Sequence, residues 1–159
     1  EARMVAEGLQ FANGLVIDEG RGQLFVAETS GDLIAAYQVS VADGSLSERR
    51  ILTGVYGPDN IEMDDQGRLW VASVLLSSLI VVDPETGDQR TIFRERSPET
   101  EAIITEWRRR AARREGAIEL FTPSLWGRLP GGITGMIVTP GGGPVFITGL
   151  GDALVKLPR

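Results

Sequence analysis

The sequence predicts an all-β protein that forms part of a β-propeller. Short apolar, strand-like runs follow one another, and each is bounded by a turn that contains Gly or Asp. The pattern that occupies residues 13–53 restarts at residue 59, and a more divergent copy restarts at residue 133. A four-strand unit that repeats about every 40 to 50 residues is typical of a propeller blade. A meandering β-sandwich with similar hairpins is the alternative, but it does not explain why the repeats align.

The composition limits the chemistry that the chain can perform. Its 159 residues suffice for one ordinary domain, and 42% of them are hydrophobic. Cysteine and histidine are both absent, which excludes disulfides, thiolate catalysis, Ser-His-Asp machinery and imidazole metal ligands. A metal would therefore be held by oxygen, which favours calcium or magnesium. A net charge of -6 argues against nucleic-acid binding, and the longest mainly apolar stretch, 70–82, is too short to span a membrane.

The first repeat is the most regular one. Residues 3–9 precede it and are predicted to be the outer strand of a preceding blade. Within the blade over 13–53, glycine- or aspartate-containing turns separate four predicted strands. These strands are expected at residues 15–18, 23–28, 33–39 and 49–53.

The second repeat, over residues 59–94, aligns with the first in register. Asp59-Asn60-Ile61 corresponds to Asn13-Gly14-Leu15, and Trp70-Val71-Ala72 corresponds to Phe25-Val26-Ala27. A tight turn at Asp65-Gln66-Gly67 is predicted to join two of its strands in a hairpin. The second repeat is therefore interpreted as the next blade.

The third repeat, over residues 133–157, is more divergent and lacks a fourth, outer strand. Its strands are expected near 134–138, 145–148 and 153–157. We therefore expect residues 1–159 to form a single, incomplete propeller domain with two exposed edges. Because the chain opens at Glu1 in the middle of the pattern, we also expect its true beginning to lie upstream, so that a signal or anchor segment there stays open.

A segment near 97–115 interrupts the repeats and is predicted to be an inserted α-helix. Ser97 can serve as N-cap, Pro98 suits the first helical position, and Gly116 can end the helix. Ile103, Trp107 and Ala111 would form a narrow apolar stripe. Its basic residues could bind an anionic membrane or nucleic acid, but a solvated helix face anchored by Trp107 is the simpler interpretation. These basic residues are arginines 108, 109, 110, 113 and 114.

Three polar residues in the aligned repeats are candidate metal ligands. Because the first strand of each propeller blade lines the central channel, Asn13, Asp59 and Asn60 are expected to converge near the axis. One carboxylate and two amide oxygens would give a partial shell for Ca²⁺, which takes six to eight oxygens. The alternatives are that Asn13 is a turn residue and that Asp59 and Asn60 cap the loop after Pro58. Their recurrence in register favours the metal site.

These motifs resemble the paraoxonase/arylesterase and strictosidine-synthase-like group of the gluconolactonase and regucalcin superfamily. The motifs that carry the resemblance are Phe11-Ala12-Asn13-Gly14, Gly57-Pro58-Asp59-Asn60-Ile61 and Gly67-Arg68-Leu69-Trp70-Val71-Ala72. The resemblance is clearest over 3–93, extends over 117–157 and is absent from the arginine-rich helix. It implies about three blades of a six-bladed propeller, corresponding to the C-terminal half of the fold, and calcium held by the residues that match the family's ligands, Asn13, Asp59 and Asn60.

The chain departs from that family in ways that affect function. The resemblance implies a further glutamate ligand, and in paraoxonases an asparagine, from blades that precede this chain. The paraoxonase histidine has no counterpart at Ser73-Val74-Leu75. Closing the ring would require the missing N-terminal blades or another chain, and we expect this chain alone to be inactive.

The implied activity is a calcium-dependent hydrolysis of a small-molecule lactone or ester. Ca²⁺ would polarise the carbonyl and stabilise the oxyanion at the channel mouth. Asp59 is the only carboxylate of the motif there, so it is the one catalytic candidate, acting as a metal ligand. The alternatives are a non-catalytic propeller that binds a ligand with structural calcium, and a strictosidine-synthase-like enzyme.

Overall fold

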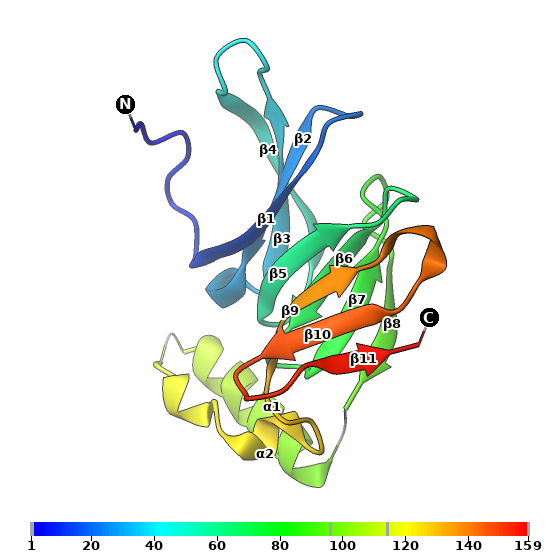
Figure 1. Cartoon of the computed structure of the whole chain (residues 1–159). Coiled ribbons are helices and arrows are strands. Elements are labelled where there is room, and N and C mark those ends of the chain that lie inside the picture. The colour runs from blue at the N-terminus through cyan, green and yellow to red at the C-terminus, as the bar shows by residue number, and fades with distance from the viewer. Residues whose placement is uncertain (1, 96, 114, 159) are drawn as a thin grey trace.

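The computed structural model contains three antiparallel sheets and a short helical segment (Figure 1). The structure describes residues 2–95, 97–113 and 115–158. The first two sheets have four strands each and the third has three. The prediction of an all-β, partial β-propeller with a helical insertion between the second and third blades is confirmed.

The strands of each sheet follow one another in chain order, as expected for blades joined by hairpins. The first sheet consists of β1 (Ala12–Asp18), β2 (Gln23–Glu28), β3 (Leu33–Val39) and β4 (Leu46–Gly54). The second consists of β5 (Pro58–Met63), β6 (Leu69–Ser73), β7 (Ser78–Val82) and β8 (Gln89–Arg94). The third consists of β9 (Ile133–Val138), β10 (Val145–Gly149) and β11 (Val155–Leu157).

The hydrophobic core lies between neighbouring sheets. β2, β3, β6 and β7 are the most buried strands because each has a partner on both sides and a neighbouring blade on at least one face. One cluster, which includes Phe25, Ile61 and Val71, fills the space between the first two sheets. A second cluster, around Trp70 and Ile147, joins the second sheet to the third. The blades are therefore held to one another mainly by apolar burial.

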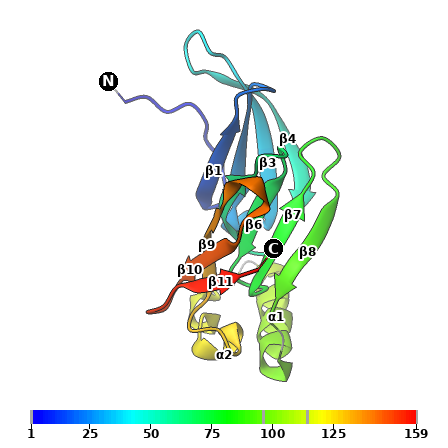
Figure 2. The same cartoon turned by 45° about the vertical axis from the view of Figure 1, so that its right-hand side comes forward.

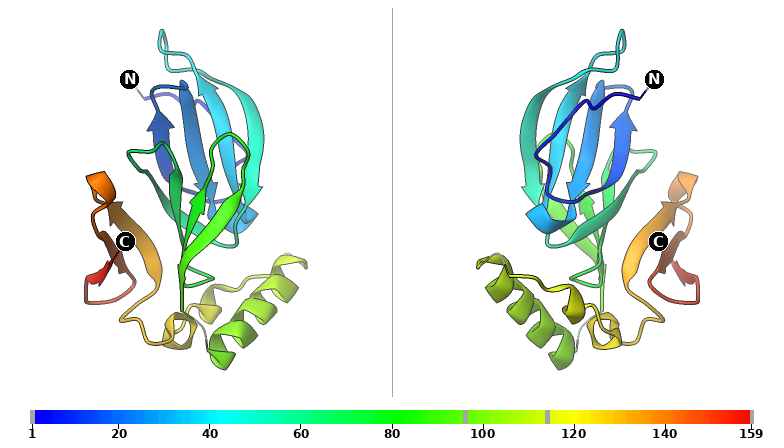
Figure 3. Two further views of the ribbon diagram at one scale, coloured as in Figure 1. Left: turned by 90° about the vertical axis from the view of Figure 1, so that its right-hand side faces the viewer. Right: turned by 90° about the vertical axis from the view of Figure 1, so that its left-hand side faces the viewer.

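The three sheets are arranged as adjacent vanes with β1, β5 and β9 on their inner edges (Figures 1 and 3). β1 lies beside β5, and β5 lies beside β9. The approach of β1 to β5 is very close. A Cβ on Gly14 would lie 2.5 Å from Asn60 Cα and from the Asp59 carbonyl oxygen, so only glycine fits there. The starts of these inner strands are thus brought together.

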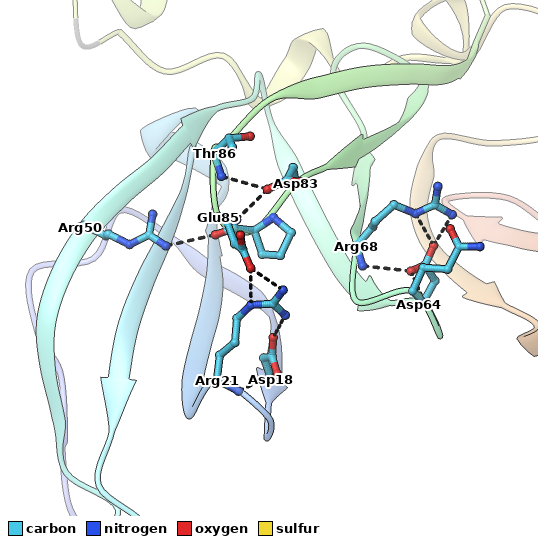
Figure 4. A network of polar contacts seen from close by, with 10 residues as sticks. Asp18, Arg21, Arg50, Asp64, Arg68, Asp83, Glu85 and Thr86 are labelled. Atoms are coloured by element: carbon cyan, nitrogen blue, oxygen red, sulfur yellow. Dashed lines mark hydrogen bonds and ion pairs between the residues drawn. The ribbon is translucent and has the colours of Figure 1, made fainter.

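Charged side chains add contacts between the first two blades at their turns (Figure 4). Arg21 forms an ion pair with Asp18 of its own blade at 2.6 Å and with Glu85 of the next blade at 2.9 Å. Arg50 of β4 also donates to the Pro84 carbonyl oxygen at 3.1 Å. Because the Glu85 side chain is largely exposed and that of Arg21 is partly exposed, we expect this ion pair to add little stability.

The helical insertion lies at the end of the molecule where β5 and β9 begin, and β8 leads into it (Figures 1 and 2). Helix α1 spans Pro98–Ala111, with Ser97 as its N-cap and Pro98 at its first position, as the sequence predicted. The 3-10 turn η2 (Ile118–Leu120) and helix α2 (Pro123–Trp126) follow, which the sequence did not indicate. No helix in residues 2–95, 97–113 and 115–158 is long and apolar enough to cross a membrane.

The apolar side of the insertion packs on the second blade. Ile104 and Leu125 are buried against Leu75, with Trp107 and Phe121 at the margin of the same cluster. Trp107 thus anchors α1 through Phe121, whose ring it meets edge-on at a centroid distance of 5.4 Å. The Ala111 side chain and all of Arg114 lie outside the described residues.

The expected strand over residues 3–9 is not formed; this segment is irregular. A strand requires a hydrogen-bonded neighbour, and the described residues contain no preceding blade with which this segment could pair. Ala6 and Leu9 instead contact the apolar cluster of Val26, Ala35 and Tyr37 on the outer face of the first sheet.

Candidate functional site

Each of the three inner strands has a β-bulge at the same place in its repeat. The register between β1 and β2 shifts between Ala12 and Leu15, and that between β5 and β6 shifts between Pro58 and Ile61. The pairing of β9 with β10 shifts next to Thr134 in the third blade. A bulge places one extra residue in a strand and redirects its side chains, and bulges are frequent beside functional sites. The sequence-predicted residues 13, 59 and 60 all lie within these bulges.

The first two bulges bring the Asn13 side chain near the Asp59 carboxyl, although 46 residues separate them in the sequence. Burial raises the pKa of the Asp59 carboxyl, and a hydrogen bond from the Asn13 side chain partly offsets this effect. The Asn13 amide also donates to Thr29 Oγ1 at 3.3 Å. An amide therefore supports the half-buried Asp59 carboxylate, and no salt bridge to Asp59 is found among the described residues.

Asn60 joins the second inner strand to the third. Its Nδ2 donates to the Thr134 carbonyl oxygen at 2.8 Å, which leaves Oδ1 as the oxygen that it could offer to a cation. Gly135, the neighbour of Thr134, lies against the Asn60 amide, because a Cβ at Gly135 would be 3.6 Å from Nδ2. Asn60 thus has a structural role at the same position where the sequence predicts a ligand.

Two residues that sequence reasoning did not single out hold the site in place. The buried Thr29 hydroxyl accepts from Asn13 and donates to the Pro58 carbonyl oxygen at 2.7 Å, so it links β1 to β5. Asp32 Oδ1 accepts from the Gly57 N–H at 2.8 Å and fixes the turn before Asp59. Burial raises the pKa of Asp32, while this hydrogen bond and the Arg108 charge oppose the shift.

Asp32 and Ser77 are turn residues at equivalent positions of the first two blades. The sequence therefore does not distinguish Asp32, which supports the candidate site, from an ordinary turn residue. Both have positive φ, 54° and 43°, and their carbonyl oxygens accept from Val55 and Glu95. The sequence signal at this position was therefore only that of a turn. The additional side-chain bond from Asp32 to Gly57 depends on the distance between blades, which the sequence does not encode locally.

The donor set fits part of a calcium site. Carboxylate and amide oxygens are the ligands that Ca²⁺ takes in proteins, and Asp59 is desolvated without a neighbouring positive side chain among the ion pairs of the described residues. The described residues bring no three acidic side chains together, so such a site would depend on amide oxygens as well as on the Asp59 carboxylate. With Asn13 and Asn60 this gives three oxygens, fewer than the six to eight that Ca²⁺ needs.

Two other polar features belong to the scaffold. Glu28, fully buried at the end of β2, accepts from the Gln10 N–H at 3.0 Å and from Arg49 at 2.6 Å. On α1, Arg109 and Arg110 both pair with Glu106 at 2.7 Å, while Arg108 stacks on the Tyr56 ring at 4.2 Å. Most of the positive charge on this helix is thus engaged within the chain.

Comparison with solved structures shows which known proteins share this fold. The chain superimposes on a luciferin-regenerating enzyme with a TM-score of 0.62, 15% identity and 93% coverage of this chain. It superimposes on a gluconolactonase from Xanthomonas campestris with a TM-score of 0.61, 23% identity and 94% coverage. It spans only 40% and 38% of those two chains. No curated protein matches it.

At this level of sequence identity, structural similarity shows the fold alone, and the family is assigned by a family model. The model described as the SMP-30/gluconolactonase/LRE-like region matches residues 1–103, which include both complete blades and the candidate ligands. The chain therefore belongs to the SMP-30/gluconolactonase/LRE-like family and forms part of a β-propeller of that family.

Proposed function

We propose that this chain is part of a calcium-dependent hydrolase of small lactones or esters, with its ligands at the start of the inner strands. The observation that carries the proposal is the repeated bulge, which brings Asn13 to the Asp59 carboxylate and sets Asn60 beside it. Membership in a family described by gluconolactonase supports the reaction class. The rest of the ring, from upstream blades or a second chain, would provide further ligands.

The roles of the residues follow from their chemistry. Asp59 would bind the cation through its carboxylate, and Asn13 and Asn60 would bind through their amide oxygens. A bound Ca²⁺ supplies a Lewis acid for the carbonyl and positive charge for the oxyanion that develops in the transition state. Thr29 orients Asn13, and Asp32 holds the turn before Asp59, so both are positioning residues. Asp59 would then be engaged as a ligand, and the general base would be another carboxylate.

The finer subgroup is also part of the proposal. The paraoxonase/arylesterase and strictosidine-synthase-like groups share the Asn13 and Asp59 motifs with this chain. The absence of histidine from its 159 residues leaves no counterpart in this chain for the paraoxonase proton shuttle. The gluconolactonase arrangement, in which calcium and carboxylates suffice, is therefore favoured.

The direct test is hydrolysis by the intact protein with and without calcium. We expect turnover of a γ-lactone or phenyl ester that a chelator abolishes. Asp59→Ala should lower kcat/KM by about 100-fold or more, since even residues that only support a metal ligand cost about 10- to 100-fold. Asp88→Ala is the matched control because Asp88 is an exposed turn carboxylate. Equal activity of the two variants, or activity unaffected by the chelator, would contradict the proposal.

The second candidate is a non-catalytic propeller whose calcium is structural. The small number of acidic side chains favours it, because the described residues contain no group of three that could hold a metal ion. In that case calcium would stabilise the intact protein, but no lactone or ester would be hydrolysed. The same pair of variants thus distinguishes the two candidates.

A further inference from the structure

The strongest unassigned feature is a cavity of about 780 Å³ between the first blade and the helical insertion. This volume lies within the range of about 300 to 1,000 Å³ that small-molecule sites occupy. Phe11 and Thr29 line it from the blade side, and Trp107, Ile118 and Phe121 line it from the insertion. Thr29 connects the cavity to the candidate ligands, because its hydroxyl accepts from Asn13 and donates to the carbonyl oxygen of Pro58, which precedes Asp59.

Phe11 adopts an unusual conformation at the wall of this cavity. Its φ is 58°, in the left-handed region that bulky side chains rarely adopt. The equivalent residue of the second blade is Gly57, with a φ of 50°, so the fold requires this conformation and glycine normally supplies it. Three hydrogen bonds hold the Phe11 segment: Gln10 N–H to Glu28, Thr29 N–H to Phe11 O, and Ser30 N–H to Gln10 O.

The strained conformation presents the Phe11 ring to the cavity instead of to the core. The ring is 65% exposed, and Ile118 across the cavity is 79% exposed. Strain of this kind persists where surrounding structure enforces it and is concentrated at functional sites. Phe11 is thus a large, exposed aromatic residue in a glycine-type conformation, two residues before Asn13, and its ring is available for contact with a ligand.

The remaining lining defines the chemistry of that ligand. Trp107 and Phe121 form an edge-to-face pair that provides a rigid aromatic wall. Among the described lining residues, Glu115 is the charged one and forms an ion pair with Arg109 at 3.3 Å. The Thr29 hydroxyl already accepts from Asn13 and donates to the Pro58 carbonyl oxygen, which leaves Gln10 and Ser30 as polar lining residues. The described part of the lining presents no arginine or lysine, and its large side chains are aromatic or aliphatic.

We infer that this cavity binds an aryl or branched alkyl substituent of a neutral lactone or ester whose carbonyl is directed toward Asn13 and Asp59. The inference rests on the proposed function for the reacting group and adds the class of substrate. It assigns Phe11, Trp107 and Phe121 to substrate selection, and it gives the insertion a role that the blades alone do not provide.

The test measures binding separately from hydrolysis, with two lactams that resist hydrolysis. Isothermal titration of the intact, calcium-loaded protein would compare 5-phenyl-2-pyrrolidinone with 5-methyl-2-pyrrolidinone. We expect the phenyl compound to bind about 10- to 50-fold more tightly, as burial of most of a phenyl ring predicts. Phe11→Gly keeps the backbone conformation and removes the ring, so it should reduce this preference by at least about threefold.

The control is Val41→Ser, because Val41 is 96% exposed in the β3–β4 turn, away from the cavity. It should leave the preference unchanged. Equal binding of the two lactams by the wild type, or an unchanged preference in Phe11→Gly, would overturn the inference. A retained preference in a protein that hydrolyses no lactone or ester would overturn the proposed function and leave the cavity assignment standing.

Discussion

Gly14 provides a demanding test of how the inner strands form the site. A methyl group added in Gly14→Ala would lie 2.5 Å from Asn60 Cα, 2.5 Å from the Asp59 carbonyl oxygen and 2.6 Å from Ile61 N. Favourable contacts between such atoms begin at about 3.5 Å, so β1 and β5 would have to separate by about 1 Å. All three neighbours are backbone atoms, which cannot rotate away as a flexible side chain can.

The cost follows from what that separation disturbs. β1 and β5 border the apolar cluster between the first two blades, and overpacking of such a region costs about 1 to 3 kcal/mol, occasionally more. Since the strain falls on backbone, we expect a loss of about 3 kcal/mol in the free energy of unfolding. The same shift would move Asn13 away from Asp59, so calcium affinity should fall as well.

Urea denaturation of the intact protein, followed by tryptophan fluorescence, measures the first effect, and calcium titration measures the second. Gly116→Ala is the matched control because no atom lies within 4 Å of a Cβ at Gly116. That variant should retain wild-type stability or gain about 0.5 kcal/mol from a less flexible unfolded chain. If Gly14→Ala unfolded within about 0.5 kcal/mol of the wild type, the close approach of the inner strands would be refuted.

Further predictions concern the scaffold. Asp32→Ala removes the acceptor of the Gly57 N–H, so it should lower the free energy of unfolding by about 1 kcal/mol and weaken calcium binding. Asp32→Asn keeps an acceptor oxygen, so it should retain most of the stability and most of the calcium affinity in urea denaturation and calcium titration. At Asp64, burial opposes ionisation, but hydrogen bonds from Arg68 and Trp70 outweigh it and lower the pKa below 3.8. Asp64→Asn should therefore lose about 2 kcal/mol at neutral pH, and the deficit should shrink as pH falls through that lowered pKa; a deficit independent of pH would contradict this. Residues 1–159 alone should form oligomers in size-exclusion chromatography through their exposed sheet edges, and a stable monomer would count against this view.

Much of the fold could be predicted because strands, turns and the start of the helix depend on local sequence patterns, and these patterns recur in each repeat. Alternating apolar runs and Gly- or Asp-containing turns define hairpins, and Ser97 with Pro98 defines the start of α1. The register between repeats placed Asn13 and Asp59 at equivalent positions, and the structure brings the two together. Residues 3–9 form no strand in this structure because a strand also needs a neighbour to pair with, so their assignment as the outer strand of a preceding blade stays a prediction.

The features that shape the site depend on contacts between distant segments. A bulge at Asn13 arises from the pairing of two strands, and periodicity of one strand cannot reveal it. Phe11 looks like an ordinary aromatic residue in the sequence, and its strain becomes visible only through its equivalence to Gly57. The cavity also forms only because the chain after α1 folds back so that Phe121 lies against Trp107, and no local sequence pattern specifies that path.

The central claim is that Asn13 and Asp59 hold calcium, and differential scanning calorimetry of the intact protein with calcium or with a chelator tests it most directly. At calcium about 100 times above its Kd, the account predicts a gain of about 2.7 kcal/mol, which raises Tm by about 5 °C or more. Asp59→Ala should abolish the gain, and Asp88→Ala should retain it. A wild-type Tm that is the same with calcium and with chelator would contradict the account.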